Sequence, residues 1–269
     1  MPESLLVWGG TISYGASAAS FLWPTKKTPG HSWLAYSFLV LGVSLLAAAL
    51  ALRWIQLGQG PFMTMYEVLL SNAFSVGLIY ALIFYFIPLS RVGAVLIVPL
   101  LFVMSMWATK VPADPVPLPA TFDSVWLWFH VLSGKVFLGF CVVAVSLSGI
   151  LLLNHFKIKS HPFAFETQLV SIDVLIWRLM AVAFIADSIM LVVGSVWAYD
   201  AWGSYWAWDP LETWALITWL VLGITLHLRI TFNLPLWAGW LLVVTVFILT
   251  FLTFFGVPFM SSGPHKGIM

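Results

Sequence analysis

Aromatic side chains are concentrated between Trp197 and Trp219, where the sequence reads WAYDAWGSYWAWDPLETWALITW. Six tryptophans, a Gly-Ser pair and three carboxylates lie here between two long apolar runs. Aromatic belts at membrane interfaces also contain tryptophan, but a belt scatters these residues among many helix ends. Six tryptophans within 23 residues therefore favour a binding surface for a large, flat, apolar ligand, oriented by a few polar groups.

Two carboxylates of this segment, Asp209 and Glu212, have a second interpretation that needs no ligand. Asp at the N-cap, Pro210 at the first helical position and Glu three residues after the cap form the capping signature of a helix. The two carboxylates therefore either cap the following helix or contact a ligand, and the sequence leaves both roles open.

The composition defines the elements that must position these residues. Of 269 residues, 62% are hydrophobic and 8% are charged, whereas soluble domains carry about 25% charged residues. Apolar runs of roughly 20 residues, long enough to cross a bilayer as helices, recur along the chain. The sequence therefore predicts an all-α, polytopic integral membrane protein that forms one membrane domain over residues 1–269. About eight spans are expected, at residues 3–23, 33–53, 66–88, 92–108, 125–153, 172–197, 213–231 and 236–258.

The distribution of charge predicts the orientation of these spans. Basic residues fall mainly in alternate loops, which the positive-inside rule places in the cytoplasm: Lys26, Lys27, Arg91, Lys157, Lys159 and Arg229. Lys110 and Lys266 are the basic exceptions on the other side. Both termini and the Trp-rich loop, residues 198–212, are therefore expected on the outer face. The chain has no nucleotide-binding loop and no basic patch for nucleic acid, and its single cysteine, Cys141, excludes thiol redox chemistry by a cysteine pair.

Histidine is the side chain here that is best suited to bind a metal. His130, in DSVWLWFHV, and His265, in SSGPHKG, are expected on the same side of the membrane as the Trp-rich loop. Two neutral imidazoles on opposite faces of a porphyrin would give a six-coordinate, bis-histidine iron. The other loop histidines lie beside Lys or Pro on the opposite side, as is typical of solvated or headgroup-facing side chains: His31, His155 and His161.

His227 differs because it falls inside the seventh predicted span. It follows Thr213 by 14 residues, which corresponds to ~21 Å along a helix. It is either a packed polar residue or an intramembrane ligand, since ionisable residues within spans are candidates for function.

Three further polar residues also have two interpretations. Arg53 and Glu67 could bind haem propionates or anchor helix ends, and Lys135 could bind a propionate or extend toward the interface.

The motifs WGSYWAWDPLETWALITWL and LHLR resemble the signature of the haem-handling protein superfamily that is named for its tryptophan-rich WWD domain. SVWLWFHV and RWIQLGQGPFMTMYEVLL resemble segments of its CcsA/ResC branch, which acts in system II cytochrome c biogenesis. The resemblance extends over most of the chain from about residue 50. It implies transport of haem across the membrane and its presentation to apocytochrome c, as part of a haem lyase.

The resemblance also implies roles for individual residues. The haem-contact motif would comprise Trp202, Gly203, Trp206, Trp208, Asp209 and Glu212. His130 and His265 would be the axial ligands of an outer haem b (iron protoporphyrin IX), and His227 an intramembrane ligand. The second intramembrane histidine would come from a CcsB/ResB-type membrane partner, and the substrate protein would be an apocytochrome c with a CxxCH motif. One departure concerns His265, since GPHK replaces the apolar-His-Ser-aromatic context of the branch.

Two alternative functions have a similar sequence profile. One is a haem chaperone or exporter without ligation activity, and the other is a HemX-like membrane regulator of tetrapyrrole synthesis. Related chaperones have six spans, and the complete WWD signature is not expected in the regulators. The expected location is the bacterial cytoplasmic membrane, or the thylakoid membrane if the protein belongs to a plastid.

Overall fold

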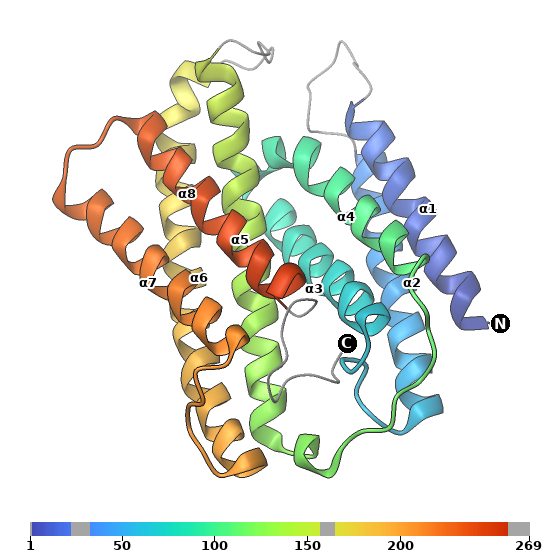
Figure 1. Cartoon of the computed structure of the whole chain (residues 1–269). Coiled ribbons are helices and arrows are strands. Elements are labelled where there is room, and N and C mark those ends of the chain that lie inside the picture. The colour runs from blue at the N-terminus through green and yellow to red at the C-terminus, as the bar shows by residue number, and fades with distance from the viewer. Residues whose placement is uncertain (1, 23–32, 157–164, 258–269) are drawn as a thin grey trace. The chain divides into compact units, whose positions relative to one another are not determined.

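A computed structural model describes residues 2–22, 33–156 and 165–257, and these residues form helices joined by short connections, with no strand among them (Figure 1). The long helices are α1 (Pro2–Leu22), α2 (Trp33–Leu57), α3 (Met65–Phe86), α4 (Ala94–Ala108), α5 (Val125–His155), α6 (Phe165–Trp202), α7 (Pro210–Thr231) and α8 (Leu236–Phe251). Shorter helical turns are η1 (Pro88–Gly93), η2 (Ala120–Phe122) and η3 (Leu252–Gly256). Within the described residues, eight helical segments are long and apolar enough to cross a membrane, which confirms the predicted polytopic, all-α class.

The observed helix ends refine the predicted spans. The fourth span begins with the 3₁₀ turn η1 and continues as α4, and the fifth is long, with 31 residues in α5. The sixth prediction was too short, since α6 continues beyond residue 197 to Trp202. No glycine or proline interrupts the chain between residues 195 and 202, so the helix ends only at Gly203. The irregular part of the predicted loop is therefore residues 203–209, and Trp202 belongs to the last turn of α6.

The chain packs as two compact units. Unit 1 contains α1 to α4, with Tyr14 of α1 at its centre. Tyr14 is fully buried, and its hydroxyl donates a hydrogen bond to the carbonyl of Ala73 in α3 at 3.1 Å. A Cβ at Gly42 or Gly77 would lie 2.6 Å or less from the Tyr14 side chain. Glycine at these two positions therefore allows α1 to pack closely against its neighbours.

Unit 2 contains α5 to α8, and Asp173 joins three of these helices. This buried carboxylate of α6 accepts hydrogen bonds from the indole N–H of Trp177 and Trp240 and forms an ion pair with Arg229. Because a buried charge needs partners, the three donors account for an aspartate at this depth. They hold α6, α7 and α8 together at the end of the unit away from the Trp-rich connection.

Candidate functional site

The connection between α6 and α7 is a tight, hydrogen-bonded loop. Gly203 ends α6 in the left-handed region, with φ +76°, and its N–H donates to the carbonyl of Tyr199 at 2.8 Å. Glycine is favoured at such a helix C-terminus because it lacks a Cβ. The ring of Tyr199 stacks on that of Tyr205 at 4.4 Å between centroids. Sequence reasoning missed this pair, which ties the exposed loop to the last turn of α6.

Asp209 and Glu212 cap α7, as the capping interpretation predicted. Asp209 Oδ1 accepts from the N–H of Glu212 at 2.9 Å, and Glu212 Oε2 accepts from the N–H of Asp209 at 3.4 Å. Glu212 Oε2 also accepts from the N–H of Ala207 at 2.7 Å. Both carboxylates therefore bind backbone amides and fix the shape of the loop that precedes them.

Trp206 and Trp208 are the two tryptophans of this loop. Trp208 is the single non-glycine residue with positive φ in the described parts of the chain, at +58°, and its side chain is 68% exposed. A bulky residue in this conformation is strained, and such strain is concentrated at functional sites. The Trp206 ring is half-buried and meets that of Trp208 edge to face at 5.8 Å. Its buried indole N–H has no hydrogen-bond acceptor among the described residues.

His130 lies on the N-terminal part of α5. This end of α5 is at the same end of unit 2 as the connection between α6 and α7 (Figure 1). Its Nδ1 is 2.9 Å from the backbone carbonyl oxygen of Met190 in α6. A carbonyl can only accept, so Nδ1 carries the proton and the imidazole lone pair is on Nε2. A histidine that donates one ring N–H to a carbonyl is the usual arrangement of a metal ligand, because the bond fixes tautomer and orientation.

Trp197 lies between His130 and Trp202, which belongs to the last turn of α6, and this central position was not predicted. The His130 ring stacks on Trp197 at 6.0 Å with an interplanar angle of 25°, and Trp202 meets Trp197 edge to face at 5.1 Å. Trp197 is 2% exposed, and its indole donates to the carbonyl of Thr121 at 3.1 Å. The sequence showed only that Trp197 belongs to the Trp cluster. Membership of the cluster does not show whether a tryptophan is buried and structural or exposed to a ligand.

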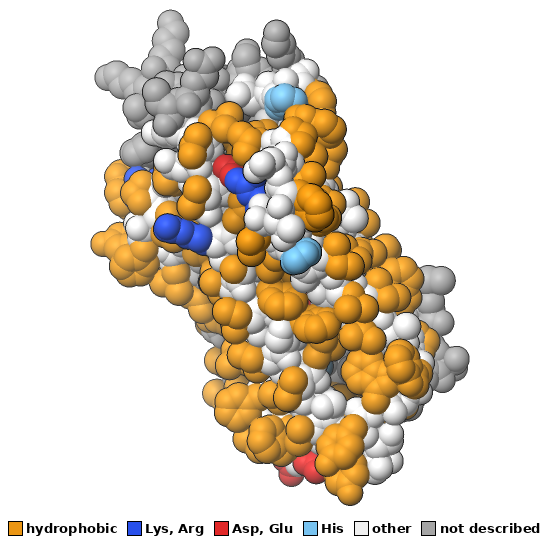
Figure 2. Space-filling view, turned by 90° about the vertical axis from the view of Figure 1, so that its left-hand side faces the viewer, with side chains coloured by type: hydrophobic (Ala, Val, Ile, Leu, Met, Phe, Trp, Pro, Cys, Tyr) orange, Lys and Arg blue, Asp and Glu red, His pale blue; other side chains and the backbone are white. Residues whose placement is uncertain are grey.

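The remaining histidine candidates lie elsewhere. His227 is exposed near the C-terminal end of α7, opposite the loop, with Nε2 3.4 Å from the Thr231 hydroxyl. The structure therefore does not bring it together with His130. His265 lies outside the described residues. Figure 2 shows histidine side chains on a face dominated by hydrophobic side chains. In the described part of the chain, no group of three or more His, Cys, Asp or Glu side chains could hold a metal ion.

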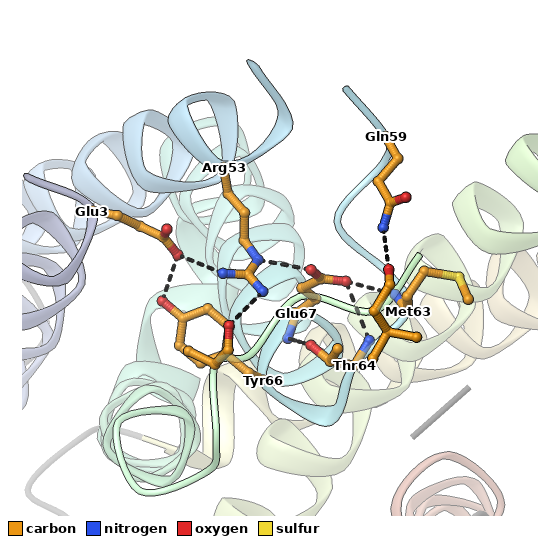
Figure 3. Close-up of polar contacts among 9 residues, drawn as sticks. Glu3, Arg53, Gln59, Met63, Thr64, Tyr66 and Glu67 are labelled. Atoms are coloured by element: carbon orange, nitrogen blue, oxygen red, sulfur yellow. Dashed lines mark hydrogen bonds and ion pairs between the residues drawn. The ribbon is translucent and has the colours of Figure 1, made fainter. Parts of the chain in front are cut away.

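The polar network around Arg53 belongs to unit 1 and is fully paired (Figure 3). Arg53 Nε donates to Glu67 at 2.7 Å, Nη1 to Glu3 at 3.4 Å, and Nη2 to the carbonyl of Ala113 at 2.9 Å. Tyr66 donates to Glu3 at 2.8 Å, and its ring lies under the guanidinium at 4.9 Å. The geometry therefore supports helix anchoring rather than propionate binding by Arg53 and Glu67.

Comparison with known proteins agrees with this arrangement of helices and motifs. A protein-family model described as "Cytochrome C assembly protein" matches residues 62–265. The cytochrome c biogenesis protein CcsA of Guillardia theta is 32% identical, over 90% of this chain and 87% of that protein. The CcsA protein of Chlamydomonas reinhardtii is 31% identical, over 85% of this chain and 67% of that protein.

A solved structure, "Cytochrome c Heme Lyase CcmF", superimposes with a TM-score of 0.62 at 17% sequence identity. The alignment covers 94% of this chain and 45% of CcmF, so the chain spans about half the length of that protein. At this identity the likeness shows the shared fold alone. The family model covers most of the chain, from residue 62 to residue 265 of 269, and the chain therefore belongs to the cytochrome c assembly protein family.

Proposed function

We propose that this chain binds haem beside the α6–α7 loop and presents it to apocytochrome c for covalent attachment. Membership of the cytochrome c assembly family supports the reaction class. The observation that carries the site is the Nδ1–Met190 hydrogen bond of His130, which places the lone pair on Nε2. This imidazole lies at the end of unit 2 where Trp206 and Trp208 present their rings.

Each part of the site has a separate task in this proposal. The faces of Trp206 and Trp208 contact the porphyrin, and the buried N–H of Trp206, which has no acceptor among the described residues, donates to an oxygen of the substrate. His130 is one axial ligand, and His265 is proposed as the other. Asp209 and Glu212 act indirectly, because their oxygens are occupied by backbone amides that hold the loop. Haem b is the proposed form of the substrate.

The proposed reaction needs orientation rather than an acid–base group from this chain. A cysteine thiol of the CxxCH motif adds across each vinyl group, so that sulfur bonds to one carbon and hydrogen to the other, without net oxidation. The reactivity belongs to the porphyrin and the thiols, and the protein contributes binding geometry and control of the iron. We therefore assign no catalytic residue.

His227 is proposed as a ligand at a separate, intramembrane position. It is exposed on α7, and we propose that the opposite ligand comes from another chain. A CcsB/ResB-type membrane partner is the proposed source. The loop would lie on the outer face of the bacterial cytoplasmic membrane or the corresponding face of the thylakoid membrane, and haem would enter at His227 before it reaches the loop.

The test is covalent attachment of haem to a co-expressed CxxCH apocytochrome, detected on a denaturing gel. The His130→Ala variant should lose attachment while accumulating in the membrane at the normal level. The matched control is His155→Ala, which removes an exposed histidine at the other end of the same helix. Normal attachment by His130→Ala would contradict the proposal, whereas haem binding without attachment by the unmodified protein would favour the chaperone or exporter function.

A further inference from the structure

The imidazole of His130 rests on one face of α6 that we call the His130 seat, formed by Met190, Gly194 and Trp197. These residues are spaced by four and three positions, so they lie on the same side of the helix. Met190 contributes its backbone carbonyl and Trp197 its indole face. Gly194 contributes the space that the ring occupies.

The absence of a side chain at Gly194 is required for this contact. A Cβ there would lie 2.6 Å from Nδ1 and 2.9 Å from Cε1 of His130. Both atoms belong to a rigid ring, and Nδ1 is the atom that donates to Met190. Relief of the clash requires the imidazole and the α6 backbone to move apart, which would lengthen or break the hydrogen bond that sets the tautomer.

Gly134 of α5 provides an internal comparison at the same helix pair. A Cβ at Gly134 would lie 2.9 Å from the Sδ atom of Met190. Methionine is unbranched and has three rotatable side-chain bonds, so its end can move without displacing the backbone carbonyl. An alanine at either glycine tightens the packing of α5 against α6, but only an alanine at residue 194 displaces the His130 ring.

We propose that Gly194 is a positioning residue for haem ligation: by leaving room for the His130 ring against α6, it holds Nδ1 on the Met190 carbonyl and directs Nε2 toward the iron. This inference rests on the proposed function, in which His130 is an axial ligand. Hydrogen bonds of this kind also raise the basicity of the ligating nitrogen, and loss of such a partner typically costs about 10- to 100-fold in metal affinity. Gly194→Ala should therefore weaken haem binding although residue 194 makes no contact with the porphyrin.

The first experiment measures haem affinity and reduction potential of purified Gly194→Ala, with Gly134→Ala as the control. Gly194→Ala should lose about 10- to 100-fold in affinity and should show a changed potential, while Gly134→Ala keeps both. Adding His130→Ala to Gly194→Ala should then cost less than it costs in the unmodified chain, because Gly194→Ala has already weakened the interaction that His130→Ala removes. Unchanged affinity and potential in Gly194→Ala would overturn the inference.

The second experiment needs no haem and separates this inference from the proposed function. ¹⁵N-histidine labelling, with His130 assigned through its alanine variant, reports which ring nitrogen carries the proton. The haem-free unmodified protein and Gly134→Ala should show Nδ1 protonated, and Gly194→Ala should show loss of that single tautomer. If the tautomer changes as expected but His130→Ala still binds haem normally, the seat exists and the ligand assignment is wrong. If Gly194→Ala keeps the Nδ1–H tautomer, the seat does not depend on Gly194.

Discussion

The chain contains two capping boxes with the same local chemistry and different surroundings. In unit 1, Thr64 is the N-cap of α3, and the Glu67 side chain accepts a hydrogen bond from the Thr64 backbone N–H. In unit 2, Asp209 is the N-cap of α7, and the Glu212 side chain accepts a hydrogen bond from the Asp209 backbone N–H. Glu67 is fully buried, and its second oxygen pairs with Arg53. Glu212 lies in the first turn of α7, directly after a loop that carries the strained and exposed Trp208.

The polar groups around the first box have partners within the fold, whereas the second box lies beside aromatic groups that we propose bind haem. Around Arg53, each guanidinium nitrogen donates a hydrogen bond, and the aromatic ring of Tyr66 faces the guanidinium. Beside the second box, Trp208 is 68% exposed and the buried N–H of Trp206 has no acceptor in the described chain. A capping box by itself therefore does not identify a site. Whether a capping box has a structural role alone, or also helps to form a binding site, depends on the residues that it holds in place.

The largest effect on stability is expected from Glu67→Ala. This change leaves the buried Arg53 without its closest carboxylate, and breaking a buried pair costs about 3–5 kcal/mol. Denaturant or thermal unfolding in detergent measures the loss. Glu3→Ala is the control and should cost less, because its contact with Arg53 is longer and Glu3 is partly exposed. Equal stability of Glu67→Ala and the unmodified protein would contradict the assignment of this network to the fold.

Unlike Glu67→Ala, the Trp206→Ala and Trp208→Ala variants should retain haem more weakly while their free energy of unfolding changes little. Each change removes a large aromatic face, and aromatic contacts contribute about 0.5–1.5 kcal/mol beyond their buried area. Haem content after purification is the measurement. Trp33→Ala, at the exposed start of α2, provides a control for a belt tryptophan. If all three variants retain haem and fail only in membrane insertion, the aromatic-belt interpretation is correct.

Asp209→Ala should have a smaller effect, of about 1 kcal/mol, through loss of the α7 cap. Haem should be lost only if removal of the cap displaces the loop between α6 and α7. Asp209→Ser keeps a capping oxygen and should therefore retain both stability and haem. Strong haem loss in the serine variant, without a change in unfolding, would instead assign Asp209 to direct contact with the substrate.

His227→Ala should leave stability almost unchanged, because the residue is exposed and makes one long side-chain contact. Loading of the loop site in cells should fall, whereas haem added to the purified variant should still bind there. The measurement compares haem occupancy after cellular expression with occupancy after reconstitution. Normal cellular loading would show that haem does not depend on His227 to reach the loop.

The sequence predicted the class of fold well, because apolar runs of bilayer length are a direct consequence of membrane burial. It also predicted the α7 cap, since Asp209, Pro210 and Glu212 form a local motif whose geometry depends on few other residues. The role of Gly194 could not be predicted, because it depends on which α6 residue faces His130, 64 positions away in the sequence. The sequence also could not show that Trp197 is buried and Trp208 is exposed, because both are tryptophans of the same cluster.

The central claim is that His130 binds the iron of a haem held by the Trp-rich loop, and the visible spectrum of the purified protein tests it most directly. The unmodified protein and His155→Ala should both carry b-type haem with the spectrum of imidazole ligation. His130→Ala should lose that absorbance, and added imidazole should restore it, because the missing group is the axial ligand. Unchanged haem content and an unchanged spectrum in His130→Ala would contradict the claim.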